Sequence, residues 1–370
     1  MKVPPLDLSK EYQSIQNEVE SRLKRVLASG RFILGQEVSK FEDRFARFIG
    51  TKYCVAVASG SDALLLSLIA LGIGKGDEVI TTPLTFIATA TAIARTGATP
   101  VFVDIDPKTF NLNPKLIQKK IIRKTKAILP VHLYGAPCDI SAINSIARKH
   151  GLFVIEDCAQ SAGAKWKGKH TGSFGDFGAF SFYPTKNLGA YGDAGAITTN
   201  HAKFNALLRS LRNHGADQKK YHHDRIGANS RLDEIQAAIL NVKLKYIDQW
   251  NKTRRQIAAR YHQLFRTAKI REVQITENVS ESVSVFHQYT ILVEQRDSLL
   301  RFLNRKGIAA SVYYPTPLHL QPCFRNLGYW KGDLPETEKA VQKILQLPIY
   351  PALSASAQRF IVSKVRQFFS

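Results

Sequence analysis

Cysteine is scarce in this sequence, and its spacing excludes two common uses of the residue. The four cysteines among the 370 residues lie far apart, at Cys54, Cys138, Cys158 and Cys323. They lack the close pairs of a zinc site and the density of a disulfide scaffold. We therefore expect a protein of the reducing cytoplasm.

Long apolar runs are also missing. No stretch approaches the roughly 18 apolar residues that a membrane-spanning helix needs. The first residues, MKVPPLDLSKEY, place charges and prolines where a signal peptide would need an unbroken apolar segment. We expect no membrane partner.

Acidic residues are few relative to basic ones. The sequence has 30 Asp and Glu against 52 Lys and Arg, a formal net charge of +22. Such an excess fits nucleic acid, a membrane surface or an anionic small substrate. The basic residues are spread through the chain without a recognised nucleic-acid motif, so we predict a generally basic surface and no nucleic-acid partner.

The segment from residue 53 to about 200 alternates short apolar runs with helical patterns. This alternation is typical of an α/β fold, a mainly parallel sheet with helices on both faces. We assign it to a large domain over residues 1–249. We predict strands over 53–58, 78–82, 100–105, 127–132, 152–157 and 179–183, and helices over 61–71, 85–96, 114–122 and 139–149.

A different pattern follows. Residues 231–265 repeat apolar positions every three to four residues without Gly or Pro, which predicts one long helix or two in series. Beyond it, a strand-like VFHQYTILVE, a helix over 297–306 and a second strand over 308–313 indicate a smaller α+β domain over residues 250–370.

Two residues with useful chemistry follow predicted strands. Asp157 ends the strand over 152–157, and Lys186 comes just after the strand over 179–183. Ligands bind at the carboxyl ends of strands in open parallel sheets, so both side chains can face one crevice. A desolvated lysine has a lowered pKa and can attack an aldehyde as the free amine. Either residue alone would more often be a capping acid or a surface lysine.

An anion site is predicted between the first strand and its helix. The segment Ser59-Gly60-Ser61-Asp62-Ala63 offers the free N–H groups of a helix start, which can hold a phosphate. A plain N-cap explains this segment equally well in isolation. An anion cradle, an acid and a lysine in this order together match a site for pyridoxal phosphate (PLP), whose ring nitrogen needs a carboxylate and whose aldehyde needs an amine.

The sequence resembles the nucleotide-sugar aminotransferases of the DegT/StrS type, within the fold-type I PLP enzymes. The resemblance covers nearly the whole chain. The segments that carry it are SGSDAL (59–64), GDEVITTPLTFIATATAI (76–93), VHLYG (131–135), IEDCAQSAGA (155–164), GDFGAFSFYPTKNLGAYGDAGAITTN (175–200), RNHG (212–215), GANSRLDEIQAAIL (227–240), YYPTPLHLQ (313–321) and LPIYP (347–351).

The resemblance implies specific cofactor contacts. Lys186 carries PLP and Asp157 pairs with its ring nitrogen, in agreement with the interpretation from the residues themselves. The resemblance further implies that Gln160 approaches the ring hydroxyl, that Phe86 stacks on the ring, and that the phosphate is held by Gly60, Ser61 and Ser181.

Other implied roles concern the partner subunit and the sugar. In such enzymes Asn229 reaches the phosphate of the neighbouring subunit's cofactor, which implies a homodimer with shared active sites. Polar and aromatic candidates for sugar contact are Tyr183, His214, Tyr313, Tyr314 and His319, although either histidine could equally be structural.

The sequence departs from the family pattern at two positions. Thr185 stands where a glycine often precedes the lysine, and Tyr313 stands where a histidine often precedes Tyr-Pro. The second departure puts the identity of the sugar-contacting donor in doubt. The cluster His222-His223-Asp224 is typical of a solvated loop, and we predict no metal.

The implied reaction is transamination. An amino acid, expected to be L-glutamate, gives its amine, and a nucleotide-linked keto-deoxyhexose then accepts it, with Lys186 moving protons. The run over 181–200 looks closer to enzymes that aminate C-3 of a dTDP-3-keto-6-deoxyhexose, for O-antigen, S-layer or antibiotic sugars. We also expect the excess positive charge of the whole chain to steer the anionic substrate, with contacts from Lys219, Arg225 and Arg231.

Three alternatives remain open at this stage. The first is amination at C-4 of a UDP- or dTDP-4-keto sugar. The second is PLP-dependent sugar dehydration, against which Lys186 argues because similar dehydratases carry histidine there. The third is a non-enzymatic regulator, which would not need Asp157, Gln160, Ser181 and Lys186 together.

Overall fold

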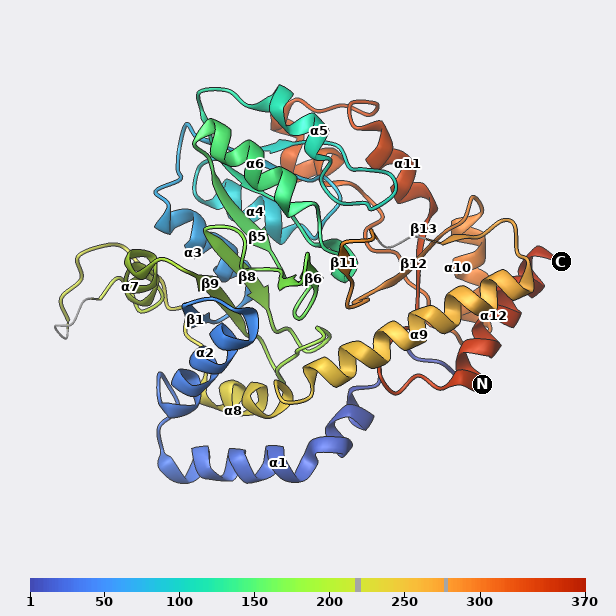
Figure 1. Cartoon of the computed structure of the whole chain (residues 1–370), viewed down its shortest axis with the longest axis horizontal. Helices are drawn as coiled ribbons and strands as arrows, with labels where there is room; N and C mark the ends of the chain where they lie inside the picture. The colour runs from blue at the N-terminus through green and yellow to red at the C-terminus, as the bar shows by residue number, and fades with distance from the viewer. Residues whose placement is uncertain (217–220, 276–278) are drawn as a thin grey trace.

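A seven-stranded sheet forms the centre of the protein (Figure 1). The structure, a computed structural model, describes residues 1–216, 221–275 and 279–370. Only β9 runs antiparallel to its neighbours, so the predicted mainly parallel sheet is confirmed. The strands, in their order across the sheet, are β1 (Tyr53–Val57), β9 (Gly195–Thr199), β8 (Phe177–Ser181), β5 (Phe153–Asp157), β4 (Thr125–Leu129), β2 (Glu78–Thr81) and β3 (Thr99–Phe102).

Each of the six predicted strands overlaps one of these, and β3, β4 and β8 begin one or two residues earlier than predicted, whereas β9 is absent from the prediction. This strand follows β8 without an intervening helix, so the alternation of strand and helix patterns used for the prediction does not reveal it. Gly195 begins β9 opposite Ser181 and passes close to the backbone of Ser59, where a Cβ atom would lie 2.3 Å from the carbonyl oxygen. The strand therefore brings β8 and the start of the first sheet helix together.

Helices cover both faces of the sheet, as predicted. Along β1, Val55 and Val57 pack with one set of helices, while Cys54 and Ala56 pack with the other, because alternate residues of a strand point to opposite faces. The first set comprises α3 (Gly60–Ala70), α4 (Ala88–Arg95) and α7 (Ala202–Leu211). The second comprises α2 (Gln36–Ile49), α6 (Ile140–His150) and α8 (Glu234–Lys243), with α1 (Leu8–Ser29) packed on α8.

The predicted helices at 85–96 and 114–122 are shorter in the structure. The first begins only at Ala88, and the second divides into α5 (Pro114–Ile117) and the 3₁₀ helix η1 (Gln118–Lys120). A small sheet joins β11 (Ser282–Val283), β6 (Lys165–Trp166) and β7 (Lys169–His170). Three further 3₁₀ helices are η2 (Leu133–Gly135), η3 (Leu318–Leu320) and η4 (Pro322–Leu327).

The helical pattern over 231–265 forms two helices in series, α8 and α9 (Ile247–Ala268), the second of the two predicted possibilities. The rest of the chain packs a three-stranded sheet against helices around its own apolar cluster, which also takes in Val3. The predicted boundary at residue 250 lies inside α9 and stays a prediction. The elements are β10 (Gln274–Ile275), β12 (Tyr289–Leu292), β13 (Ile344–Leu347), α10 (Arg296–Arg305), α11 (Pro335–Lys343) and α12 (Ala355–Phe369).

The prediction of a strand over 308–313 is wrong. Ile308 and Ser311 make only isolated bridges, and β13 occupies the position beside β12. The Gln346 side chain accepts a hydrogen bond from the Tyr313 backbone N–H at 2.8 Å, which replaces the next ladder bond. The chain then leaves the sheet edge and carries Tyr313 and Tyr314 toward the main cavity.

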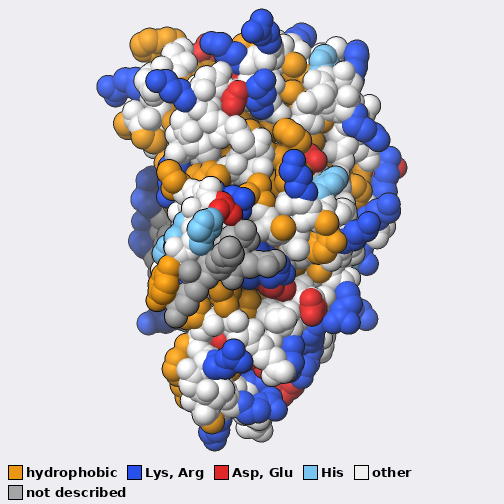
Figure 2. Space-filling model, turned by 90° about the vertical axis from the view of Figure 1, so that its left-hand side faces the viewer, with side chains coloured by type: hydrophobic (Ala, Val, Ile, Leu, Met, Phe, Trp, Pro, Cys, Tyr) orange, Lys and Arg blue, Asp and Glu red, His pale blue; other side chains and the backbone are white. Residues whose placement is uncertain are grey.

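The surface in Figure 2 shows lysine and arginine scattered over the visible face, with few acidic residues among them. No single basic stripe stands out on this face. Within the described ranges, no helix is both long and apolar enough to cross a membrane.

Candidate active site

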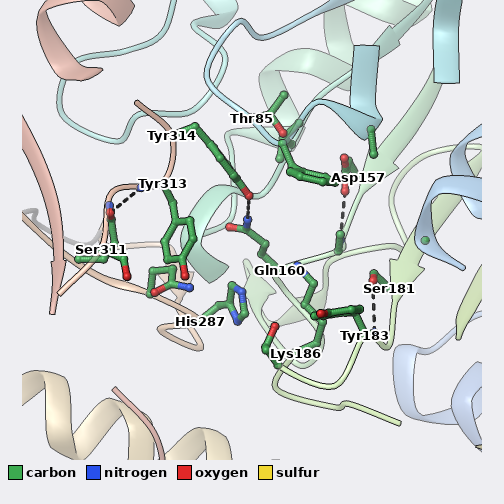
Figure 3. Close-up of a pocket in the computed structure, with 18 of the residues that line it drawn as sticks. Thr85, Asp157, Gln160, Ser181, Tyr183, Lys186, His287, Ser311, Tyr313 and Tyr314 are labelled. Atoms are coloured by element: carbon green, nitrogen blue, oxygen red, sulfur yellow. Dashed lines mark hydrogen bonds between the residues drawn. The ribbon is translucent and has the colours of Figure 1, made fainter. Parts of the chain in front are cut away.

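A cavity of about 670 Å³ lies at the carboxyl ends of β5 and β8 and is lined on its other side by the C-terminal part of the chain. Figure 3 shows its central side chains pointing toward one another. The predicted site residues that line it are Gly60, Ser61, Phe86, Asp157, Gln160, Ser181, Tyr183, Lys186, Tyr313 and Tyr314. Ten residues from five separate parts of the sequence therefore meet in one place.

Asp157 is buried at the end of β5, and helix α4 holds it in place. Its Oδ2 accepts a hydrogen bond from the Thr89 hydroxyl at 2.8 Å, and its Oδ1 accepts one from the Ala159 N–H at 3.1 Å. Thr85 lies 3.0 Å from the Thr89 oxygen and must donate to it, because the Thr89 hydrogen is already used. Burial raises the pKa of Asp157, and the two hydrogen bonds oppose that rise.

Lys186 follows β8 and reaches the same cavity. Its backbone N–H donates to the Tyr183 carbonyl at 2.8 Å, which closes a turn that points the side chain inward. Burial lowers the pKa of Lys186 to about 8, and the nearby charge of Asp157 only partly offsets this. About one tenth of the amine is thus uncharged at pH 7, far more than for an ordinary lysine, and can act as a nucleophile.

The segment predicted to form an anion cradle lies at the start of α3. Ser59 caps the helix, with its hydroxyl accepting from the Asp62 N–H at 3.1 Å. A Cβ atom at Gly60 would lie 2.5 Å from the Cβ of Ser181, so only glycine permits β8 to approach this helix end. The free N–H groups of the first turn and the Ser181 hydroxyl face the cavity together and can hold a phosphate.

Gln160 and Tyr314 form the wall between Asp157 and the C-terminal part. The Gln160 carbonyl oxygen accepts from the Tyr134 N–H at 2.6 Å, so its amide nitrogen is the group that donates to the Tyr314 hydroxyl at 3.2 Å. The ring of Phe86 lies 5.8 Å from that of Tyr314 and is 53% exposed. An aromatic face is thus available above the cavity.

The structure adds His287 and its hydrogen-bond partners, which the sequence interpretation did not include. Asn187 Nδ2 donates to Asn251 Oδ1 at 2.8 Å and to the Val285 carbonyl at 3.0 Å. Its Oδ1 must therefore accept from His287 Nδ1, which lies 3.1 Å away. Burial and the charges of Lys186 and Arg254 hold the pKa of His287 well below its usual range, so the ring is neutral with an unprotonated Nε2.

Three predicted site residues lie outside the cavity lining. Asn229 is exposed and forms a backbone bridge with Asn213. His214 is exposed too, and its carbonyl accepts from His223 Nδ1 at 2.9 Å. His319 is 1% exposed and lies 3.1 Å from a carboxylate oxygen of Glu338. Their functional roles stay predictions.

Two of the three basic residues suggested for steering, Arg225 and Arg231, also lie apart from the cavity lining. Arg225 donates to the Ser210 hydroxyl at 2.8 Å, and Arg231 donates to Asn213 Oδ1 at 3.1 Å. Lys219 falls outside the described residues. His222 Nδ1 lies 3.1 Å from Asp224 Oδ1 at an exposed position.

A second buried polar group, His132, Glu156 and Cys158, has its donor atoms within 4.8 Å of one another. The Glu156 carboxylate accepts from His132 Nε2 and from three backbone N–H groups between residues 172 and 175. His132 Nδ1 accepts from the Cys138 N–H at 3.1 Å. These bonds occupy the lone pairs of His132 and Glu156, and they anchor the loop before β8 to β5.

Comparison with known proteins identifies the family. The DegT/DnrJ/EryC1/StrS aminotransferase family matches residues 13–366. The chain belongs to this family. It is therefore an aminotransferase, and aminotransferases of this family depend on PLP.

Several known proteins match this chain over nearly its whole length. It is 50% identical to a pleiotropic regulatory protein of Geobacillus stearothermophilus, covering 100% of this chain and 99% of the relative. It is 44% identical to dTDP-3-amino-3,6-dideoxy-alpha-D-galactopyranose transaminase of Aneurinibacillus thermoaerophilus, with 99% of both covered. It is 43% identical to UDP-2-acetamido-2-deoxy-3-oxo-D-glucuronate aminotransferase of Pseudomonas aeruginosa, with 96% and 97% covered.

Among solved structures, DesV of S. venezuelae in complex with a ketimine intermediate is similar throughout. The TM-score is 0.96 at 41% sequence identity, and 99% of this chain and 98% of DesV are covered. The fold-type I architecture predicted from the sequence is confirmed by this likeness.

The residues that line the cavity of this aminotransferase fit PLP. Lys186, whose amine is partly neutral, lines the cavity and can react with the aldehyde. The buried carboxylate of Asp157 lines it too and can pair with the ring nitrogen. The helix start at Gly60 offers N–H groups that can bind the phosphate.

Proposed function

We propose that this aminotransferase transfers the amine of L-glutamate to C-3 of a dTDP-linked 3-keto-6-deoxyhexose. The observation that carries the proposal is that Lys186 and Asp157 face one cavity from the ends of two adjacent strands. The names of the relatives support the substrate class, since they specify 3-amino or 3-oxo sugars on dTDP or UDP.

Each cavity residue has a definable task in this proposal. PLP, when bound, supplies an aldehyde for the amine and a ring that accepts electrons. Asp157 keeps a proton on the ring nitrogen, and Thr89 holds the carboxylate in position for it. Lys186 attaches the cofactor and, when released, carries a proton between the reacting carbon and the neighbouring atoms. Gly60, Ser61 and Ser181 bind the phosphate.

The aromatic side chains suit a sugar. Tyr183 is 51% exposed beside Lys186, and Tyr313 and Tyr314 face it across the cavity (Figure 3). The Tyr134 hydroxyl donates to the Tyr313 carbonyl and fixes this segment. We assign hydroxyl contacts of the sugar to these tyrosines, which combine a polar tip with an apolar face.

The remaining parts of the proposal concern assembly and context. A homodimer would place Asn229, which is exposed, against the partner subunit's cofactor phosphate. Excess positive charge would speed capture of the nucleotide sugar, so kcat/KM should fall as ionic strength rises. We expect a cytoplasmic enzyme of amino-sugar biosynthesis, for lipopolysaccharide O-antigen or related glycans.

Amination at C-4 is the alternative reaction. Dehydration lacks support because Lys186 is present. The name of the Geobacillus relative alone favours a regulatory role, and a regulator has no use for a buried lysine whose pKa is lowered toward that of a nucleophile.

The test supplies the PLP-loaded protein with L-glutamate and, one at a time, dTDP- and UDP-linked 3-keto and 4-keto sugars, and locates the new amine by NMR. We expect a dTDP-linked 3-amino product, and none from Lys186→Ala. A product aminated only at C-4 would replace the proposed substrate with the alternative, and no product from any sugar would overturn the proposal.

A further inference from the structure

Arg254 is a buried cation with no acidic partner. It is 3% exposed, and its Nη1 donates to the carbonyls of Phe286 at 3.2 Å and Ile349 at 3.0 Å. No carboxylate of the described residues forms an ion pair with it. The acid that most influences it, Glu11, already lies 2.5 Å from Lys243. Buried charges are normally paired, so an unpaired guanidinium requires an explanation.

Its surroundings supply one, because Arg254 lines the same cavity as Lys186. Two carbonyls fix Nη1, while Nε and Nη2 have no acceptor within the described part of the chain. A guanidinium presents its N–H groups as a planar fork that matches a carboxylate. The side chain is therefore held with donors free at the cavity wall.

Arg254 is also bonded to the segment that carries His287 into the cavity. Its Nη1 donates to the carbonyl of Phe286, the residue before His287, and Figure 3 shows His287 beside Lys186. Since its Nδ1–H is committed to Asn187, this histidine is neutral and contributes no compensating negative charge. Arg254 is thus anchored to the residue next to a side chain that lies beside Lys186.

We propose that Arg254 binds a carboxylate of the amino donor and of the keto acid that the donor becomes. The inference rests on the proposed transamination and adds a donor subsite to it. An amino acid carries a carboxylate on the reacting carbon itself, which suits a cation that lines the same cavity as Lys186. A nucleotide sugar carries its diphosphate on C-1, away from C-3 or C-4, and therefore reaches the cavity with its anion farther from the lysine.

The first test measures binding without chemistry. Isothermal titration of the PLP-loaded protein with glutarate, an unreactive dicarboxylate, is compared with glutaramide, its neutral diamide. Wild type should bind glutarate far more tightly. Arg254→Gln should weaken glutarate binding by about 30-fold or more, as expected for removing one partner of a buried charge pair. Arg254→Lys should give an intermediate value.

The matched control is Arg255→Gln, a half-buried arginine on the same helix that does not line the cavity. It should bind glutarate within about twofold of wild type. If Arg254→Gln does not fold, the comparison of glutarate with glutaramide in wild type still decides. Equal binding of the two compounds would overturn the inference.

The second test separates the two half-reactions. Arg254→Gln should lose conversion of the cofactor by L-glutamate, while the protein loaded with the aminated cofactor should still aminate the keto sugar at close to the wild-type rate. Equal losses in both would show a structural role and overturn the inference. Weakened binding of dTDP or UDP with unchanged glutarate binding would assign Arg254 to the nucleotide and overturn it too. Failure of the proposed function would look different. Wild-type protein would then aminate no sugar, regardless of how tightly it binds glutarate.

Discussion

Thr89 donates its hydroxyl hydrogen to Asp157 Oδ2 at 2.8 Å, across the buried junction of α4 and β5. Without this bond the buried carboxylate would keep only the Ala159 N–H as a donor. The bond lowers the pKa of Asp157 against the effect of burial and so favours the carboxylate that a protonated ring nitrogen needs.

Thr89→Val keeps the shape of the side chain and removes the donor. Hydrogen bonds to charged groups contribute about 1.5–3 kcal/mol, so the dissociation constant of PLP should rise about 10-fold or more. The loss should grow at acid pH, because the pKa of Asp157 rises. Thr91→Val is the control, since Thr91 bonds only backbone carbonyls of its own helix. Equal affinities for PLP in wild type and Thr89→Val would contradict the assigned role of Asp157.

Gly60→Ala places a Cβ atom 2.5 Å from the Cβ of Ser181. Overpacking of this kind costs about 1–3 kcal/mol and displaces the phosphate cradle. We expect weaker retention of PLP, by about fivefold or more, measured by dialysis and absorption. Gly74→Ala is the control, because a Cβ there would meet its nearest atom at 3.6 Å. An unchanged cofactor content in Gly60→Ala would place the phosphate elsewhere.

The lowered pKa of Lys186, about 8, predicts how cofactor attachment depends on pH. Protonated lysine cannot attack an aldehyde, so the rate of attachment to the apoprotein should rise about tenfold per pH unit below 8 and level off above it. An ordinary lysine would keep the rate rising to about pH 10.4. Stopped-flow absorption at a series of pH values measures the midpoint, and a midpoint near 10 would contradict the assigned environment.

His287 should stay neutral across the physiological range, with its proton on Nδ1. Burial and two nearby cations lower its pKa, and Asn187 Oδ1 selects the tautomer. Nitrogen NMR of histidine-labelled protein should show an unprotonated Nε2 between about pH 6 and 8. Asn187→Leu should release the tautomer preference, and protonation of both nitrogens at pH 7 in wild type would refute the hydrogen-bond assignment.

The sequence was sufficient for the parts of the site that follow from strand order. Asp157 and Lys186 come after adjacent parallel strands, and that topology alone brings them to one edge. The N-terminal cradle at Gly60 follows from the same rule. The antiparallel β9 escaped prediction because no helix separates it from β8.

Residues from the C-terminal part could not be placed in the same way. His287 and Asn187 are 100 residues apart, and no local pattern predicts their bond. The strand predicted over 308–313 would have kept Tyr313 in the sheet, whereas Tyr313 and Tyr314 leave the sheet edge and line the cavity. Arg254 did carry a signal, since it shares a helix face with the buried apolar residues Trp250, Ile257 and Tyr261. A lone cation on such a face indicates a ligand or a buried bond.

The most direct test of the account is to locate the covalent attachment of the cofactor. Reduction of the PLP-loaded protein with borohydride converts the Schiff base to a stable amine, and peptide mass spectrometry then identifies the modified lysine. We expect the modification at Lys186 alone, and none in Lys186→Ala. Modification of a different lysine, or none in wild type, would contradict the site described here.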